Sequence, residues 1–126
     1  MRVLVDTHIV LWWLIDSRKL PEDAERIIKD KDNTIFVSAA SIWEIAIKAT
    51  LGQIEADPFA IEAAIEPSGF VELPITGKHA AHISQLPLHH RDPFDRILVA
   101  QSLLEPMRLL TGDQVLAQYG EMVLLV

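Results

Sequence analysis

A short stretch at residues 89–96, His-His-Arg-Asp-Pro-Phe-Asp-Arg, places carboxylates and basic side chains together at the start of a predicted helix. Asp92 is a good helix N-cap, and Pro93 is a good first helical residue because proline lacks an N–H that would be unsatisfied there. Asp95 shares a helix face with Asp92 and lies in the first turn, where the helix dipole favours an anion. Two interpretations of Asp95 stay open: a surface carboxylate matched to the dipole, or a group that takes part in chemistry.

Two further aspartates follow apolar segments that are typical of buried strands. Asp6 ends the segment 2–6, and Asp113 follows the segment 108–111 after one glycine. In open α/β sheets, ligands bind at the carboxyl ends of the parallel strands. Asp113 has a structural alternative as the N-cap of a helix that begins at Gln114. An acid that closes a buried strand, such as Asp6, must be solvated, hydrogen-bonded or bound to a cation.

Glu44 is the fourth candidate acid, and it lies in an otherwise apolar helical segment. Ser41 and Glu44 match a capping box, and Glu44 and Lys48 have the spacing of an i, i+4 ion pair. If Ser38 caps the helix instead, the capping box disappears and Glu44 stands in the second turn among apolar neighbours. The sequence alone does not decide whether Ser38 or Ser41 begins this helix.

Four carboxylates gathered at one sheet edge would repel one another and raise one another's pKa values unless a cation bound between them. The chain has no cysteine, and a carboxylate cluster without thiolates is a ligand set for Mg²⁺ or Mn²⁺ rather than for zinc. Two such ions about 3.5–4 Å apart activate water and stabilise the leaving oxygen in phosphodiester hydrolysis. The acids therefore predict metal-dependent cleavage of a phosphodiester.

The formal net charge of −7 argues against a general grip on nucleic acid through phosphate neutralisation. Bound metal cations would supply the positive field that the chain lacks. Half of the residues are apolar and 23% are charged, which predicts one compact domain over residues 1–126. The longest apolar run, residues 9–15, is too short to span a bilayer, so we expect a cytoplasmic protein without a membrane segment.

Apolar periodicity predicts strands that alternate with helices. Strands are expected over residues 2–6, 34–37, 70–73, 108–111 and 122–126. Helices are expected over residues 9–16 with Thr7 as the cap, then 21–32, 38–51 or 41–51, 58–66, 76–86, 93–104 and 114–119. This alternation predicts an α/β fold in which helices cover both faces of a parallel sheet.

Four segments resemble, in order, the four motifs of PIN domains, and more narrowly those of VapC-type toxins of toxin–antitoxin pairs. They are residues 3–8, 41–48, 90–101 and 110–113. The resemblance covers the whole chain and implies a three-layer α/β/α sandwich around a parallel sheet of about five strands. It also implies a Mg²⁺- or Mn²⁺-dependent ribonuclease, commonly a homodimer, that is restrained by a cognate antitoxin protein.

The same resemblance implies roles for particular residues. It implies metal binding and catalysis by four acids, Asp6, Glu44, Asp95 and Asp113. It implies that two threonine hydroxyls, those of Thr7 and Thr111, orient the first and last of these acids, as metal ligands require. Asp92 is left as a cap or as a group outside the ligands.

Basic side chains near these acids are candidates for contacts with RNA phosphates, namely His90, Arg96 and Lys48. His89 and Arg91 are candidates as well, but for them the solvated or ion-paired interpretation is favoured. The alternative is that they are solvated or paired with the acids. Trp12 and Trp13 have two interpretations as well. They would stack on bases or, as is usual for an apolar stripe at helical spacing, pack in a core or an interface.

Three functions compete at this stage. The first is an endoribonuclease in which metal-activated water attacks the phosphodiester without a covalent protein intermediate. The second is a response-regulator-like phosphoacceptor, which needs an aspartate at a mid-chain strand end and a lysine after the last strands. Residues 70–74 offer no aspartate, and no lysine follows Lys78. The third is a PIN-fold binding module that acts through its apolar first helices.

Overall fold

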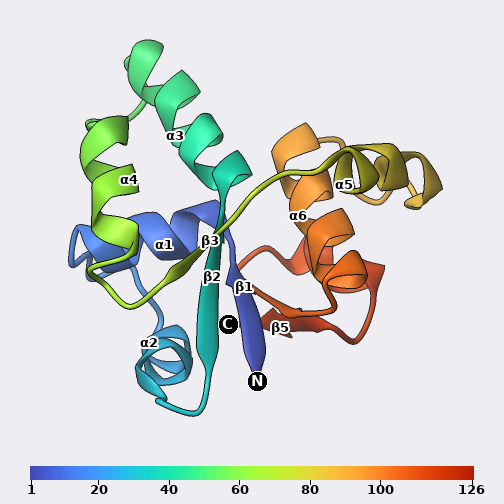
Figure 1. The fold of residues 1–126 in the computed structure, drawn as a ribbon, viewed down its shortest axis with the longest axis horizontal. Helices are drawn as coiled ribbons and strands as arrows, with labels where there is room; N and C mark the ends of the chain where they lie inside the picture. The colour runs from blue at the N-terminus through green and yellow to red at the C-terminus, as the bar shows by residue number, and fades with distance from the viewer.

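The computed structural model describes all 126 residues, and its centre is a sheet of five strands (Figure 1). The strands are β1 Arg2–Val5, β2 Thr34–Ser38, β3 Val71–Leu73, β4 Arg108–Thr111 and β5 Val123–Leu125. Their order across the sheet is β3-β2-β1-β4-β5, and every neighbouring pair is parallel. The parallel sheet that the sequence predicts is therefore confirmed.

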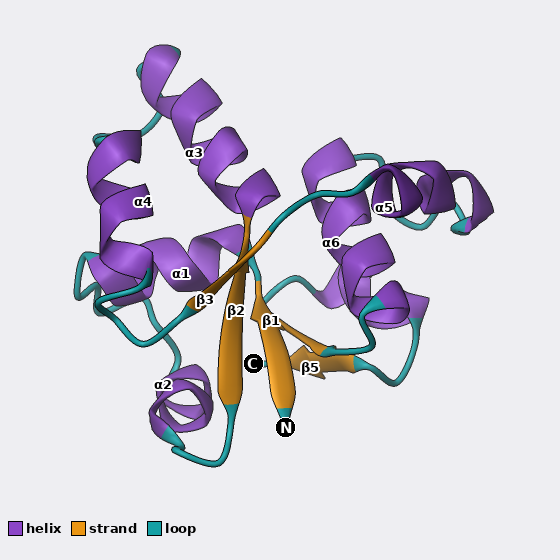
Figure 2. Cartoon of the chain, viewed as in Figure 1, coloured by secondary structure: helices purple, strands orange, loops and turns teal.

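Helices connect the strands and cover both faces of the sheet. The α-helices are α1 Thr7–Leu14, α2 Glu22–Lys29, α3 Ala39–Thr50, α4 Pro58–Ile65, α5 Gly77–His82 and α6 Pro93–Leu104, and the 3₁₀ segments are η1 Ile83–Gln85 and η2 Gln114–Tyr119. Figure 2 shows α1, α2 and α4 on one side of the sheet and α5 and α6 on the other. This arrangement confirms the expected three-layer α/β/α sandwich.

Alternation along β1 divides its apolar side chains between two cores. Val3 and Val5 pack in one core with residues of α1 and α2, whereas Leu4 packs on the opposite face with α6 residues such as Leu98. These strand residues are fully buried, as expected for a parallel strand covered on both faces. The packing fixes the carboxyl end of β1 at the middle of the sheet.

The chain changes direction across the sheet at β1. Strands β2 and β3 extend the sheet on one side of β1, and β4 and β5 extend it on the other. At such a switch point the connections leave in opposite directions and open a crevice outside the carboxyl ends of the strands. The backbone N–H of Asp6 donates to the carbonyl of Leu110 at 2.9 Å, so the ends of β1 and β4 lie side by side.

Two helix starts near this edge are now defined. The cap of α1 is Asp6, whose side chain accepts from the backbone N–H of Thr7. Thr7, expected as the cap, is instead the first helical residue, because β1 ends at Val5 and Asp6 takes the cap position. Helix α3 is capped by Ser38, which accepts from the backbone N–H of Ala40. The capping box between Ser41 and Glu44 therefore does not form.

Two other expected helices are shorter or tighter than predicted. The segment 76–86 divides into α5 and η1, and the segment 114–119 is the 3₁₀ segment η2 rather than an α-helix. No helix in the structure combines the length and the apolar character that crossing a bilayer requires.

Candidate metal centre

Asp6 is held at the carboxyl end of β1 by hydrogen bonds to both of its carboxylate oxygens. Oδ1 accepts from the backbone N–H of Thr7 at 2.7 Å, and Oδ2 accepts from the hydroxyl of Thr111 at 2.6 Å. Burial raises the pKa of Asp6, although the bonds from Thr111 and Thr7 pull it down. A buried carboxylate that is costly to ionise and fixed in orientation is suited to binding a cation.

Asp113 is linked to Asp6 through Thr111. The hydroxyl oxygen of Thr111, which donates to Asp6, also accepts from the backbone N–H of Asp113 at 3.0 Å. Oδ1 of Asp113 accepts from the backbone N–H of Val115 at 2.9 Å and caps η2. Thr111 therefore lies between the two acids, whereas the hydroxyl of Thr7 donates to Ser41 at 2.9 Å and does not reach Asp6.

Thr7 thus contributes to Asp6 through its backbone and not, as expected, through its hydroxyl. The physical reason is its place as the first residue of α1, which aims its N–H at the capping carboxylate and its side chain toward α3. The hydroxyl contact with Ser41 instead joins the starts of two helices, and both residues are buried.

Asp95 lies in the first turn of α6, beyond the cap. Asp92 is that cap, and its Oδ1 accepts from the backbone N–H groups of Phe94 at 2.8 Å and Asp95 at 3.4 Å. Burial raises the pKa of Asp95 to about 7, and the negative charges of Asp6 and Asp92 add to this effect. The electrostatic interaction with His90 lowers the pKa of Asp95. Without a cation, this carboxylate stands in a field that opposes its ionisation.

Glu44 is almost fully buried in the second turn of α3. Its Oε2 lies 2.8 Å from Nζ of Lys48, and this contact raises the pKa of Lys48. Its Oε1 has no hydrogen-bond partner although it is buried. Glu44 also raises the pKa values of Asp6 and Asp95 through like-charge repulsion, so it belongs to the same electrostatic cluster.

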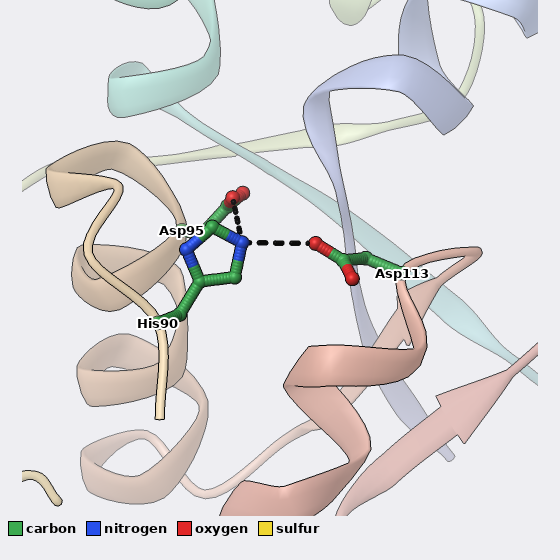
Figure 3. A group of neighbouring side chains, drawn as sticks. All are labelled: His90, Asp95 and Asp113. Atoms are coloured by element: carbon green, nitrogen blue, oxygen red, sulfur yellow. Dashed lines mark hydrogen bonds and ion pairs between the residues drawn. The ribbon is translucent and has the colours of Figure 1, made fainter. Parts of the chain in front are cut away.

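His90 lies between two of the acids, as Figure 3 shows. Its Nε2 is 3.0 Å from Oδ2 of Asp113 and 3.2 Å from Oδ2 of Asp95. These three residues have ligand atoms within 4.8 Å of one another. The sequence singled out His90 for phosphate contact and kept pairing with the acids as the alternative, and pairing with Asp95 and Asp113 is what the structure shows.

The acids open onto a pocket of about 300 Å³. It is lined by Asp6, His8, Trp12, Asp95, Gly112 and Asp113. Glu44 lines a second pocket of about 410 Å³ together with Lys48 and Asp92. A larger hollow, of about 800 Å³, lies beside α4 and β3 and contains none of the predicted site residues. The structure therefore brings three predicted acids into one pocket, whereas Glu44 lines a different one.

Arg96 is occupied by the protein itself. Its Nη2 donates to the carbonyl of Ile83 at 3.1 Å, and its Nη1 donates to the carbonyl of Pro87 at 3.0 Å and to the hydroxyl of Tyr119 at 3.2 Å. A guanidinium with these partners is not free to make the bidentate phosphate contact expected of it. Tyr119, which the sequence did not identify, takes part because η2 brings it beside the loop before α6.

The two tryptophans of α1 are partly buried and pack against the core that contains Val3 and Val5. The ring of Trp13 lies 6.1 Å from that of Phe70, measured between centroids. Packing is thus their observed contact, although Trp12 also lines the pocket of the acids.

The sequence model of the PIN domain family matches residues 3–122. The chain belongs to the PIN domain family. Among curated proteins, none matches this sequence. The fold of this PIN domain is shared by several solved structures. One is VapBC2 from Rickettsia felis bound to a DNA fragment from the promoter, with TM-score 0.67 and 15% identity over 100% of this chain and 98% of the other.

Two other solved structures are similar to this PIN domain. FitAB bound to the IR36 DNA fragment gives TM-score 0.63 and 18% identity, covering 97% of this chain and 93% of the other. FitAcB from Neisseria gonorrhoeae gives TM-score 0.63 and 15% identity, covering 98% and 96%. At such identities these likenesses establish the fold.

The donor set of this PIN domain fits a hard divalent cation. The acids offer carboxylate oxygens, the chain has no thiolate, and the buried Oε1 of Glu44 lacks any donor within the protein. Oxygen ligands of this kind suit Mg²⁺ or Mn²⁺. A cation beside these groups would also offset the repulsion that raises the pKa of Asp95.

Proposed function

We propose that this PIN domain is a Mg²⁺- or Mn²⁺-dependent endoribonuclease and the toxin of a toxin–antitoxin pair. The observation that carries the proposal is the excess of buried negative charge at the carboxyl ends of β1 and β4. The unpartnered Oε1 of Glu44 and the raised pKa of Asp95 both reflect that excess. A divalent cation is the ligand that relieves it.

Asp6, Glu44, Asp95 and Asp113 would hold the metal. A bound divalent ion supplies activation of water and compensates charge on the leaving oxygen of a phosphodiester. The chain itself fixes the ligands before substrate arrives. Thr111 holds Asp6 and the backbone of Asp113, Lys48 neutralises one oxygen of Glu44, and Asp92 anchors the first turn of α6. None of these groups is placed as a nucleophile, so we propose direct attack by water.

The chain's net charge of −7 favours a substrate that binds through the metal centre rather than through a broad basic surface. Of the expected phosphate contacts, Arg96 is engaged internally and Lys48 is paired with Glu44. Arg91 is exposed and lines the pocket that adjoins Glu44, so it is the better candidate for a phosphate contact near the metal.

An antitoxin and a second copy of the chain are the proposed protein partners. Similar folds occur in the VapBC2 and FitAB complexes, which supports an assembly of this kind. Large apolar side chains on α3 and α4 stand in solvent, with Trp43 58% exposed and Phe59 82% exposed. Exposed apolar groups on adjacent helices indicate a surface that a partner covers.

The decisive experiment is RNA cleavage by the purified full chain with Mg²⁺ or Mn²⁺, compared with Asp95→Asn. We expect the variant to lose cleavage by a factor of about 100 or more, because a carboxylate beside the metal becomes a neutral amide. Asp32→Asn, an exposed aspartate in the turn before β2, is the matched control and should cleave normally. Metal-dependent cleavage retained by Asp95→Asn would contradict the proposal.

The same comparison separates the enzyme from a binding module that acts only through a partner. A binding module would show no metal-dependent cleavage in either form and would keep partner binding in Asp95→Asn. The phosphoacceptor alternative gains no support, because β3 ends in Leu73 and Pro74 follows it.

A further inference from the structure

The imidazole of His90 is held on both of its nitrogens. Nε2 faces Oδ2 of Asp113 at 3.0 Å and Oδ2 of Asp95 at 3.2 Å. On the other side of the ring, Nδ1 accepts from the backbone N–H of Asp92 at 3.0 Å. Figure 3 shows the ring aimed between the two carboxylates. Neither binding of a metal by His90 nor a contact of His90 with phosphate would explain the hydrogen bond at Nδ1.

The bond to Nδ1 decides where the ring proton lies. A backbone N–H is always a donor, so Nδ1 must present its lone pair to Asp92. The proton of the imidazole is then on Nε2, which makes Nε2–H a donor toward the carboxylates. To bind a metal through Nε2, the ring would have to move its proton to Nδ1, where it would oppose the N–H of Asp92.

We propose that His90 is a positioning residue that donates through Nε2–H to Asp95 and Asp113 and is not itself a ligand of the metal. This inference rests on the proposed function, because the two acids are proposed metal ligands. It assigns His90 the task of fixing the distance and rotation of carboxylates that belong to different elements. The lone pairs not used by these bonds stay available to a cation.

Asp113 illustrates the effect of this contact. Oδ1 accepts from the backbone N–H of Val115 at 2.9 Å, and Oδ2 accepts from His90. With a donor on each oxygen, the carboxylate group cannot rotate without breaking a hydrogen bond. Asp113 is only partly buried, so packing alone would not fix it. Ordered ligands lower the cost of closing around a metal ion.

The loop that carries His90 is itself fixed by Arg96 and Tyr119. The hydroxyl oxygen of Tyr119 accepts from the backbone N–H of His90 at 3.0 Å and from Nη1 of Arg96 at 3.2 Å. Nη1 of Arg96 also reaches the carbonyl of His90 at 3.4 Å. His90 is therefore fixed in backbone and side chain by residues of α6 and η2, which explains why Arg96 points into the protein.

The tautomer can be measured without metal or RNA. Two-bond ¹H–¹⁵N correlation spectra of the metal-free full chain distinguish Nε2–H from Nδ1–H imidazoles, and loss of one signal set in His90→Gln assigns His90. We expect the Nε2–H form. An Nδ1–H ring, or a ring protonated on both nitrogens, would overturn the inference because neither accepts from Asp92.

The role toward the metal is tested by Mn²⁺ binding and by its electron spin echo spectrum. We expect no coupling from a directly bound imidazole nitrogen in the wild-type chain. His90→Ala should bind Mn²⁺ about tenfold more weakly, as is usual when a group that orients a ligand is lost. His90→Gln keeps an N–H donor at the end of the side chain and should recover most of the affinity. His82→Gln is the matched control and should bind normally.

The outcomes separate this inference from the proposed function. A nitrogen coupling that disappears in His90→Gln, or unchanged binding in His90→Ala, would overturn the positioning role while the metal centre stands. A wild-type chain that shows the Nε2–H ring but binds no Mn²⁺ would refute the proposed function and support the donor assignment.

Discussion

The hydroxyl of Thr111 donates to Oδ2 of Asp6 at 2.6 Å and joins two neighbouring strand ends that lie 105 positions apart in the chain. Both residues are buried, so this oxygen has no water to replace the threonine. The same hydroxyl accepts from the backbone N–H of Asp113 at 3.0 Å. One side chain therefore sets the relative positions of two acids in the candidate metal centre.

We expect Thr111→Val to lower the free energy of unfolding by about 1–3 kcal/mol, because the buried carboxylate oxygen of Asp6 and the partly buried N–H of Asp113 both lose their partner. Mn²⁺ affinity should fall as well, since Asp6 is no longer held in one orientation. Urea unfolding and calorimetric Mn²⁺ titration measure the two effects. Thr111→Ser keeps the hydroxyl and should stay near wild type; an equal loss in both variants would contradict the hydrogen-bond explanation.

The metal-free chain should become less stable as pH rises from about 4 to 7. The pKa of Asp95 is raised to about 7 in the folded chain, from an ordinary value of 3.8. In this range the folded state binds more protons than the unfolded state, so the free energy of unfolding falls with pH and levels off only once the pH has passed the folded-state pKa of about 7. Unfolding by urea at several pH values, with and without Mg²⁺, measures the effect.

Asp95→Asn removes this titration, so above pH 7 the metal-free variant should be more stable than the wild-type chain. The expected difference is on the order of 2 kcal/mol, roughly half of what the pKa shift alone implies, because solvent screens a partly exposed carboxylate. Mg²⁺ should stabilise the wild-type chain and have a much smaller effect on the variant. A variant that is less stable than wild type at pH 8 without metal would contradict the electrostatic account.

Lys48→Met should destabilise the metal-free chain by about 2 kcal/mol. The buried carboxylate of Glu44 then loses the ammonium group that lies 2.8 Å from it. The effect is smaller than the roughly 3–5 kcal/mol of a fully buried pair because Lys48 is partly exposed. Addition of Glu44→Gln should recover part of the loss, and a double-mutant cycle by thermal unfolding isolates the coupling.

His79→Ala should weaken the fold and leave the metal centre unchanged. His79 is buried, its Nδ1 accepts from the backbone N–H of Thr76 at 3.0 Å, and its Nε2 lies 2.5 Å from Glu105. Loss of these contacts should cost about 2–4 kcal/mol. His82→Ala, on the same helix, is the control. Equal Mn²⁺ affinity of the two folded variants would show that His79 stabilises the fold without affecting the metal centre. A tenfold loss of Mn²⁺ affinity in His79→Ala would contradict this prediction.

Local sequence patterns predicted the strands and the acids at their ends because both depend on short, contiguous signals. An apolar run that ends at Asp6 indicates a strand end by itself, and Asp92 followed by Pro93 indicates a helix start by itself. The choice between Ser38 and Ser41 as the cap of α3 depends on where β2 leaves the sheet, and tertiary packing rather than local sequence determines that position. The packing places Glu44 in the interior rather than in a capping box.

The sequence could not identify the hydrogen-bond partners of His90 and Arg96, for a different reason. Their partners include Tyr119, which lies 29 and 23 positions away, and backbone carbonyls of a loop without a regular pattern. Sequence spacing reports which residues share a helix face, but it does not report which carbonyl groups a loop presents. The internal hydrogen bonds of Arg96 were for this reason not predicted, and its expected phosphate contact stays a prediction.

Three aspartates near the site perform a second task. Asp6, Asp92 and Asp113 each cap the helical segment that follows, through bonds to its first backbone N–H groups. Selection for a well-formed helix start would preserve these side chains in a relative that had lost all cleavage. Glu44 caps no helix, and without a cation its buried, unpartnered oxygen destabilises the fold. In a comparison of relatives, retention of the glutamate would therefore be the more reliable mark of an active nuclease than retention of the aspartates.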